Sequence, residues 1–170
     1  MISDILRTFR VNGDGRIVLV VTGGLGDTIL FSPVFRGARR AMPQAEVKLV
    51  TASPLVQELY SSAPEIDRIE IIDTNRKLSP ALYLRLWRCG ARCRRGNGTD
   101  IMVCASRLSP WLIRLFKVVC RPRNFISPPL PVDQLNDLEV NVALSRRLAP
   151  DISTKDAFAP VTAEASARVQ

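Results

Sequence analysis

The feature that most constrains the fold of this chain is an apolar run that leads directly into a glycine-rich turn. Residues 16–22 (RIVLVVT) are β-branched and aliphatic almost throughout, which is typical of a strand covered on both faces. Residues 23–27 (GGLGD) then supply the glycines of a tight turn. A strand of this kind needs helices on both faces of its sheet, so the sequence predicts an α/β protein.

The rest of the chain repeats this alternation of short apolar runs with amphipathic segments. Further strands are predicted at residues 46–51, 67–72, 100–105 and 123–126. Helices are predicted at residues 31–42, 54–61, 80–95, around 111–116 and at 136–149. Strands joined by helical crossovers run parallel, so we expect a Rossmann-like, doubly wound parallel sheet. Ligands bind such sheets beyond the carboxyl ends of the strands, which directs attention to the loop after the first strand.

That glycine-rich loop differs from the loops that bind nucleotide phosphates. It lacks the Gly-Lys-Ser/Thr ending of a P-loop, and Ile29 stands where the dinucleotide fingerprint has its third glycine. Asp27 would in addition repel a pyrophosphate at the start of the following helix. We therefore expect no nucleotide at this loop.

Asp27 itself has two interpretations. As an ionised carboxylate held by backbone N–H groups, it can accept the proton of an attacking hydroxyl. Alternatively it only caps the helix, which is a common role of aspartate. The pair Ser32-Pro33 also has the pattern of a cap followed by a first-turn proline, which would place the start of the main helix later, near Phe31.

The composition excludes several classes of site. The chain has no histidine, so a catalytic histidine and a Cys/His zinc site are both ruled out. Its four cysteines lack two matched pairs with zinc spacing, so no metal is expected, and Cys104 reads as a core residue. No apolar run exceeds five residues, and the first fifteen residues show no signal-peptide pattern. A cytoplasmic location is the resulting expectation.

Positive charge is concentrated in the middle of the chain. The net charge is +8, yet residues 74–132 alone carry twelve Lys or Arg and one acid. Four arginines share one surface of the helix predicted at residues 80–95, namely Arg85, Arg88, Arg92 and Arg95. This surface is either a docking face for anionic lipid or other anions, or an ordinary solvated face. No nucleic-acid partner is expected, since no recognition motif is present and only 6% of residues are aromatic.

The run at residues 20–33 (VVTGGLGDTILFSP), followed by a basic helix and Pro43, resembles the amino-terminal motif of the heptosyltransferase-like glycosyltransferases of family 9. The resemblance covers roughly residues 15–150 and is most specific in the glycine-aspartate loop. It implies the amino-terminal half of a two-domain GT-B enzyme. In that family this half holds the acceptor, typically a lipopolysaccharide-type glycolipid at the inner face of the inner membrane, and the other half holds the nucleotide-sugar donor.

The resemblance also implies roles for individual residues. Asp27 matches the proposed general base of the family, and the loop around it is expected to contact the substrate through Gly23, Gly24, Gly26 and Thr28. Arg107 follows the fourth strand, which neighbours the first in a doubly wound order, so we expect it near the acceptor.

The chain is accordingly divided into a leader at residues 1–15, an acceptor-binding domain at 16–150, and a linker or start of a missing donor domain at 151–170. The tail is expected to be mobile, with the core ending near Ala149. No cofactor is expected in this half. An ADP-heptose-like donor would bind the missing half, supplied as a separate partner if one exists, and the chain would be inactive alone. The alternative is a non-enzymatic Rossmann-like binding module with a basic, membrane- or anion-binding face.

Overall fold

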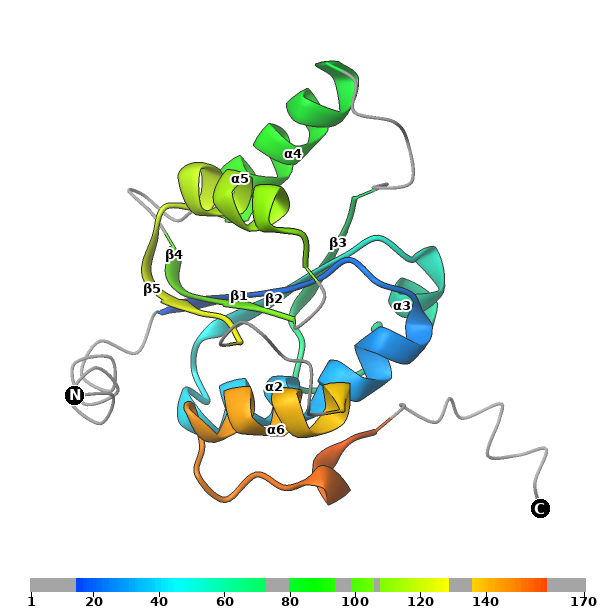
Figure 1. The fold of residues 1–170 in the computed structure, drawn as a ribbon, viewed down its shortest axis with the longest axis vertical. Helices are drawn as coiled ribbons and strands as arrows, with labels where there is room; N and C mark the ends of the chain where they lie inside the picture. The colour runs from blue at the N-terminus through cyan, green and yellow to red at the C-terminus, as the bar shows by residue number, and fades with distance from the viewer. Residues whose placement is uncertain (1–14, 73–79, 94–98, 106–107, 129–135, 159–170) are drawn as a thin grey trace.

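A five-stranded parallel sheet forms the centre of the molecule (Figure 1). The computed structural model describes residues 15–72, 80–93, 99–105, 108–128 and 136–158. The strands are β1 (Arg16–Val21), β2 (Glu46–Thr51), β3 (Arg68–Ile71), β4 (Thr99–Cys104) and β5 (Pro122–Ile126). Their order in the sheet is β3-β2-β1-β4-β5, with every pairing parallel. The predicted α/β class and doubly wound parallel sheet are therefore confirmed, with β4 beside β1.

Helices cover both faces of the sheet. They are α2 (Leu25–Ala41), α3 (Pro54–Tyr60), α4 (Pro80–Cys93), α5 (Pro110–Cys120) and α6 (Asp137–Arg146), with a short 3₁₀ turn, η1 (Thr154–Asp156). Figure 1 shows α4 and α5 on one side and α2, α3 and α6 on the other. A hydrophobic core lies on each face of the sheet, and alternate residues of β1 point into one or the other. Leu19 packs in the core beneath α2 and α6, and Val20 packs in the core beneath α4 and α5. This two-sided burial explains why the strand is apolar at successive positions.

The first helix begins earlier than the sequence analysis predicted. Helix α2 starts at Leu25, with Gly24 at its N-cap, so the expected start near Phe31 is wrong. Pro33 lies inside this helix, where it has no N–H to offer the carbonyl of Ile29. The hydroxyl of Ser32 donates to that carbonyl instead, at 2.6 Å. The Ser32-Pro33 pair therefore has the sequence pattern of a cap, but it lies inside the helix, where the serine hydroxyl satisfies the carbonyl that the proline leaves without a donor.

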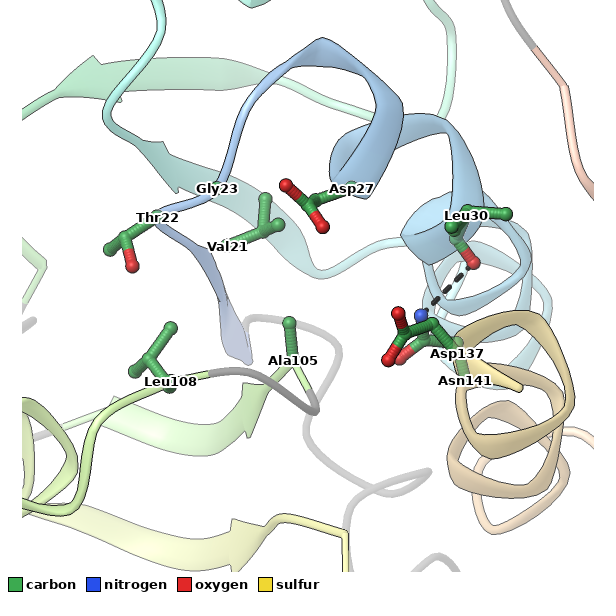
Figure 2. A pocket seen from close by; sticks show the side chains of 9 residues that line it. All are labelled: Val21, Thr22, Gly23, Asp27, Leu30, Ala105, Leu108, Asp137 and Asn141. Atoms are coloured by element: carbon green, nitrogen blue, oxygen red, sulfur yellow. Dashed lines mark hydrogen bonds between the residues drawn. The ribbon is translucent and has the colours of Figure 1, made fainter. Parts of the chain in front are cut away.

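Helices α2 and α6 pack closely against each other. Gly37 makes this approach possible, because a Cβ at this position would overlap the side chain of Ser145 on α6. The hydroxyl of Ser145 donates to the carbonyl of Pro33 at 2.7 Å, and it is fully buried. This contact places the first turn of α6 beside the first turns of α2, and thus beside the glycine-rich loop (Figures 1 and 2).

A buried lysine supports the end of α4. Lys48 on β2 is 2% exposed, and its ammonium donates to the carbonyl of Arg92 at 2.7 Å. The guanidinium of Arg16 donates to the same carbonyl at 3.3 Å. Both cations therefore stabilise the carboxyl end of a helix, where the unpaired carbonyls carry partial negative charge.

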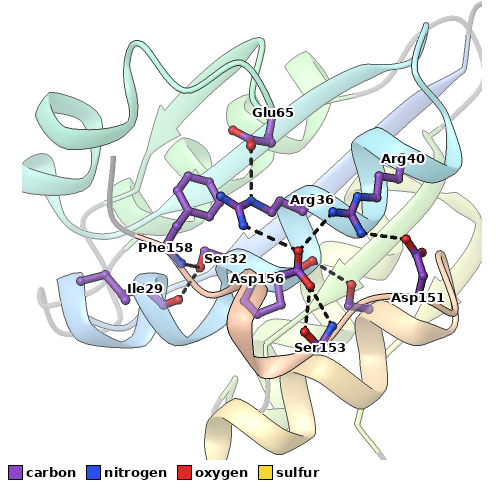
Figure 3. Close-up of polar contacts among 11 residues, drawn as sticks. Ile29, Ser32, Arg36, Arg40, Glu65, Asp151, Ser153, Asp156 and Phe158 are labelled. Atoms are coloured by element: carbon purple, nitrogen blue, oxygen red, sulfur yellow. Dashed lines mark hydrogen bonds and ion pairs between the residues drawn. The ribbon is translucent and has the colours of Figure 1, made fainter. Parts of the chain in front are cut away.

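Residues 150–158 return across α2 instead of leaving the domain (Figure 3). The ring of Phe158 packs edge-on against Phe35 and Tyr60, with centroids 6.5 and 5.8 Å away. The backbone N–H of Phe158 donates to the hydroxyl of Ser32 at 2.7 Å, and Asp156 forms ion pairs with α2 through Arg40 at 3.2 Å. The expectation that the packed core ends near Ala149 is therefore wrong, because the ring of Phe158 also packs against the core. Residues 1–14 and 159–170 lie outside the described residues.

Candidate functional site

A pocket of about 260 Å³ opens where β1 and β4 end (Figure 2). Three segments form its walls: the end of β1 with the glycine-rich loop and α2, the chain after β4, and the first turns of α6. The described residues that line it are Val21, Thr22, Gly23, Asp27, Leu30, Ala105, Leu108, Asp137 and Asn141. The pocket thus occupies the position at the carboxyl ends of the strands where parallel sheets bind their ligands.

Asp27 is both a helix cap and a pocket residue. Its Oδ2 atom accepts the backbone N–H of Gly24 at 2.9 Å, which is the half of a capping box that the third residue of a helix supplies. Figure 2 shows the carboxylate turned toward the pocket. A carboxylate has about four lone-pair positions, so the cap bond leaves capacity for a further donor. Capping and proton acceptance are therefore compatible at this residue, and the cap fixes where the carboxylate lies.

The glycines of the loop differ in what surrounds them. A Cβ at Gly23 would overlap the carboxylate of Asp27, so this position must remain glycine for the cap to form. A Cβ at Gly24 or at Gly26 would meet no atom within 4 Å. Contacts among the described residues therefore explain why residue 23 is a glycine. They do not require glycine at positions 24 and 26, where the space beside the backbone is open.

The other residues expected at the site are placed as follows. Thr28 is fully buried and does not line the pocket; its hydroxyl donates to the carbonyl of Gly24 at 3.1 Å. This hydrogen bond of Thr28 is therefore internal to the first turn of α2 and does not face the pocket. Arg107 lies outside the described residues, although Ala105 and Leu108 on either side of it line the pocket.

Asp137 and Asn141 line the pocket but were not among the site residues expected from the sequence. Asn141 is 2% exposed, and its side-chain NH₂ donates to the carbonyl of Leu30 on α2 at 3.1 Å. Asp137 is the first residue of α6, and the N-cap before it is Asn136, whose side chain accepts the N–H of Glu139 at 2.9 Å. The signal that places α6 beside the loop is the tight contact of Gly37 with Ser145, which a single sequence does not reveal.

The basic surface lies on α4, on the opposite side of the sheet from α2 and α6 (Figure 1). Arg85 and Arg88 are exposed beside the half-exposed rings of Tyr83 and Trp87. Arg92 is exposed as well and pairs with Glu70 at 3.0 Å, whereas Arg95 lies outside the described residues. Within the described part of the chain, none of the helices combines the length and the apolar character needed to cross a membrane.

The cysteines are buried on this same side of the sheet. Cys89, Cys93 and Cys120 lie in the core between α4, α5 and the sheet. Hydrogen bonds from Cys120 and Cys89 lower the pKa of Cys93, and burial raises the pKa of Cys104 to about 12. Cys104 is fully buried, as expected of a core residue. Among the described residues, no group of three or more Cys, Asp or Glu side chains is arranged to hold a metal ion.

The sequence and the fold were compared with those of known proteins. No protein-family profile and no curated protein matches the sequence. The fold does match a glycosyl transferase of family 9 from Veillonella parvula, with a TM-score of 0.64 and 19% identity over 88% of this chain and 46% of that one. The chain has the fold of part of a family 9 glycosyltransferase. The resemblance drawn from the glycine-aspartate loop is thereby confirmed at the level of the fold.

Two heptosyltransferases of Escherichia coli match this family 9-like fold as well. WaaC, solved with ADP, gives a TM-score of 0.61 at 14% identity over 82% of this chain and 48% of its own. ADP-heptose lps heptosyltransferase II gives 0.55 at 13% identity over 85% and 45%. The chain therefore spans less than half the length of each of these structures.

Proposed function

We propose that this chain is the acceptor-binding, amino-terminal half of an inverting glycosyltransferase. The observation that carries the proposal is the carboxylate of Asp27, which a helix cap holds at the edge of a pocket beyond the ends of β1 and β4. In the proposed reaction an acceptor hydroxyl attacks the anomeric carbon of a nucleotide sugar. A new glycosidic C–O bond forms, the bond from that carbon to the phosphate oxygen breaks, and the nucleoside diphosphate leaves. Asp27 takes the proton of the hydroxyl.

The proposed substrates follow from the folds that this chain resembles. The donor is a nucleotide sugar of the ADP-heptose type, bound by a carboxyl-terminal half. The acceptor is a glycolipid of the lipopolysaccharide-core type. Support comes from the match to two heptosyltransferases, in each of which the matched region is less than half of the chain.

This division of labour predicts that the chain alone has no measurable affinity for a nucleotide sugar. The glycine-rich loop carries Asp27 where a phosphate-binding loop would carry a lysine, so a diphosphate meets a negative charge there. Isothermal titration calorimetry with ADP-heptose and with ADP measures this directly. A micromolar dissociation constant for either ligand would contradict the proposal.

We further propose that α4 docks on the anionic inner face of the inner membrane, which places the protein in the cytoplasm. Arg85 and Arg88 are exposed on this helix, next to Tyr83, Leu84 and Trp87, which are 48%, 48% and 55% exposed. Exposed aromatic rings among cations suit the interface of a bilayer, where apolar and charged groups are both accommodated. A protein docked in this way would be close to a glycolipid acceptor in the same membrane.

The double substitution Arg85→Gln with Arg88→Gln is expected to weaken binding to vesicles that contain phosphatidylglycerol. Each cation near an anionic surface contributes about 1 kcal/mol, so affinity should fall roughly 30-fold. Arg92 is left in place because it pairs with Glu70. The control is Arg147→Gln with Lys155→Gln, which removes the same charge from two exposed residues elsewhere. Equal sedimentation of the two double variants would rule out α4 as the docking surface.

A second candidate function is a non-enzymatic binding module with the same basic face. The observation that favours it is the exposed face of α4, whose cations and aromatic rings could bind an anionic surface without a donor-binding half. The two functions are distinguished by adding a donor-binding half: transfer that depends on Asp27 supports the enzyme, and vesicle binding without any transfer supports the module.

A further inference from the structure

The amide oxygen of Asn141 is buried in the pocket without a hydrogen-bond partner among the described residues. The side chain is only 2% exposed. Its orientation is fixed, because the carbonyl of Leu30 accepts a hydrogen bond from the amide, and only the NH₂ group donates one. The oxygen is therefore the free end of this amide, and Figure 2 shows the side chain at the pocket wall beside Asp137.

A buried acceptor without a partner costs free energy, so it marks a position where a donor belongs. The hydrogen bond from the NH₂ group to Leu30 holds Asn141 in place before any ligand arrives. A ligand group that donates to the oxygen recovers the cost of burying it. A ligand without such a donor does not.

The other polar side chains of the pocket point to the same kind of ligand. Asp27 and Asp137 contribute carboxylates, which only accept hydrogen bonds when ionised, and Thr22 contributes a hydroxyl. Among the described residues that line the pocket, no side chain is cationic. A carboxylate or phosphate placed here would meet the negative charge of Asp27 and the buried oxygen of Asn141, whereas a hydroxyl can donate a hydrogen bond to either.

We propose that Asn141 is a specificity-determining residue that accepts a hydrogen bond from an uncharged, polyhydroxylated sugar ring in this pocket. The inference rests on the proposed function, because it gives Asp27 one hydroxyl of that ring and Asn141 another. The anionic groups of a larger acceptor would then lie outside the pocket. The reacting unit of the acceptor is therefore a neutral sugar and not an acidic one.

A titration of the isotope-labelled chain with two simple sugars tests this directly. The probes are methyl α-glucopyranoside and methyl α-glucopyranosiduronate, which differ only at C6, where the first has a hydroxymethyl group and the second a carboxylate at neutral pH. We expect the neutral sugar to shift the amide resonances of Gly23, Ala105 and Asn141, and to bind at least about tenfold more tightly than the acidic one. Tighter or equal binding of the acidic sugar, or no binding of either, would overturn the proposal. This comparison requires no variant to fold.

The variant Asn141→Leu removes the oxygen while keeping the side-chain shape, and it is expected to weaken the neutral sugar about tenfold. It also loses the hydrogen bond to Leu30, so Ser145→Ala serves as the matched control. That change removes a neighbouring bond between α6 and α2, to Pro33, at a residue that does not line the pocket. We expect the control to bind like the unaltered chain. Equal weakening in both variants, or in neither, would contradict a role for Asn141 in specificity.

The sugar titration and the proposed transfer fail independently. If transfer proves not to depend on Asp27 while the neutral sugar binds through Asn141, the proposed reaction is wrong and the binding site stands. If transfer depends on Asp27 but the titration shows no preference for the neutral sugar, only the inference about Asn141 is refuted.

Discussion

Replacing Asp27 by asparagine is expected to slow sugar transfer about 10²–10⁴-fold once a donor-binding half completes the enzyme, which is the usual contribution of a general base. Asparagine keeps an oxygen that can accept the N–H of Gly24, so the start of α2 should survive the change. It cannot take up a proton at neutral pH. Single-turnover rates with saturating donor measure the effect on the chemical step.

Glu139→Gln is a control matched in helix position to Asp27→Asn. Glu139 is the third residue of α6, as Asp27 is of α2, and each carboxylate accepts the backbone N–H of its N-cap residue. Glu139 does not line the pocket. The control should therefore transfer sugar at the rate of the unaltered protein. If both variants retain near-normal rates, Asp27 is a cap and nothing more.

Gly23→Ala is expected to reduce transfer about 100-fold even though it leaves the carboxylate in the chain. The added methyl group would occupy the space of the Asp27 carboxylate, and a displacement of about 1 Å in a reacting group costs rate on this scale. Gly24→Ala is the control, since its methyl group would meet no atom within 4 Å. Both variants are compared by single-turnover rate and by thermal unfolding.

The outcome for the glycines also tests where the acceptor lies. Gly26→Ala has free space for its methyl group, so the fold should tolerate it. A loss of rate at unchanged melting temperature would place substrate against the backbone of Gly26, as the family resemblance implies. Normal transfer by Gly23→Ala would show that the Asp27 carboxylate does not need the space left by the missing side chain of Gly23.

The sheet could be predicted from the sequence because its signal is local. Continuous apolar runs such as residues 16–22 are characteristic of strands buried on both faces, and each run became a parallel strand. The start of α2 was predicted wrongly because two local signals competed. Ser32-Pro33 has the residue types of a cap, whereas the true cap uses the backbone of Gly24 and a side chain three residues later. Both patterns satisfy the same rules for helix starts, and packing decides between them.

The site could be predicted only where it is built from one segment. Asp27 lies in the loop that the sequence singles out, so residue type and position were sufficient to find it. Asn141 reaches the pocket through its bond to Leu30, 111 residues earlier in the chain. That contact depends on how closely α2 and α6 approach at Gly37 and Ser145. Such an approach is a property of the packed fold, so no spacing rule applied to residues 136–149 alone would have indicated it.

The segment at residues 150–158 connects distant parts of the molecule. Asp156 and Phe158 attach it to α2, through Arg36, Arg40 and Ser32 (Figure 3). The same helix carries Asp27 in its first turn. One continuous helix therefore joins the packing of residues 150–158 to the carboxylate at the pocket.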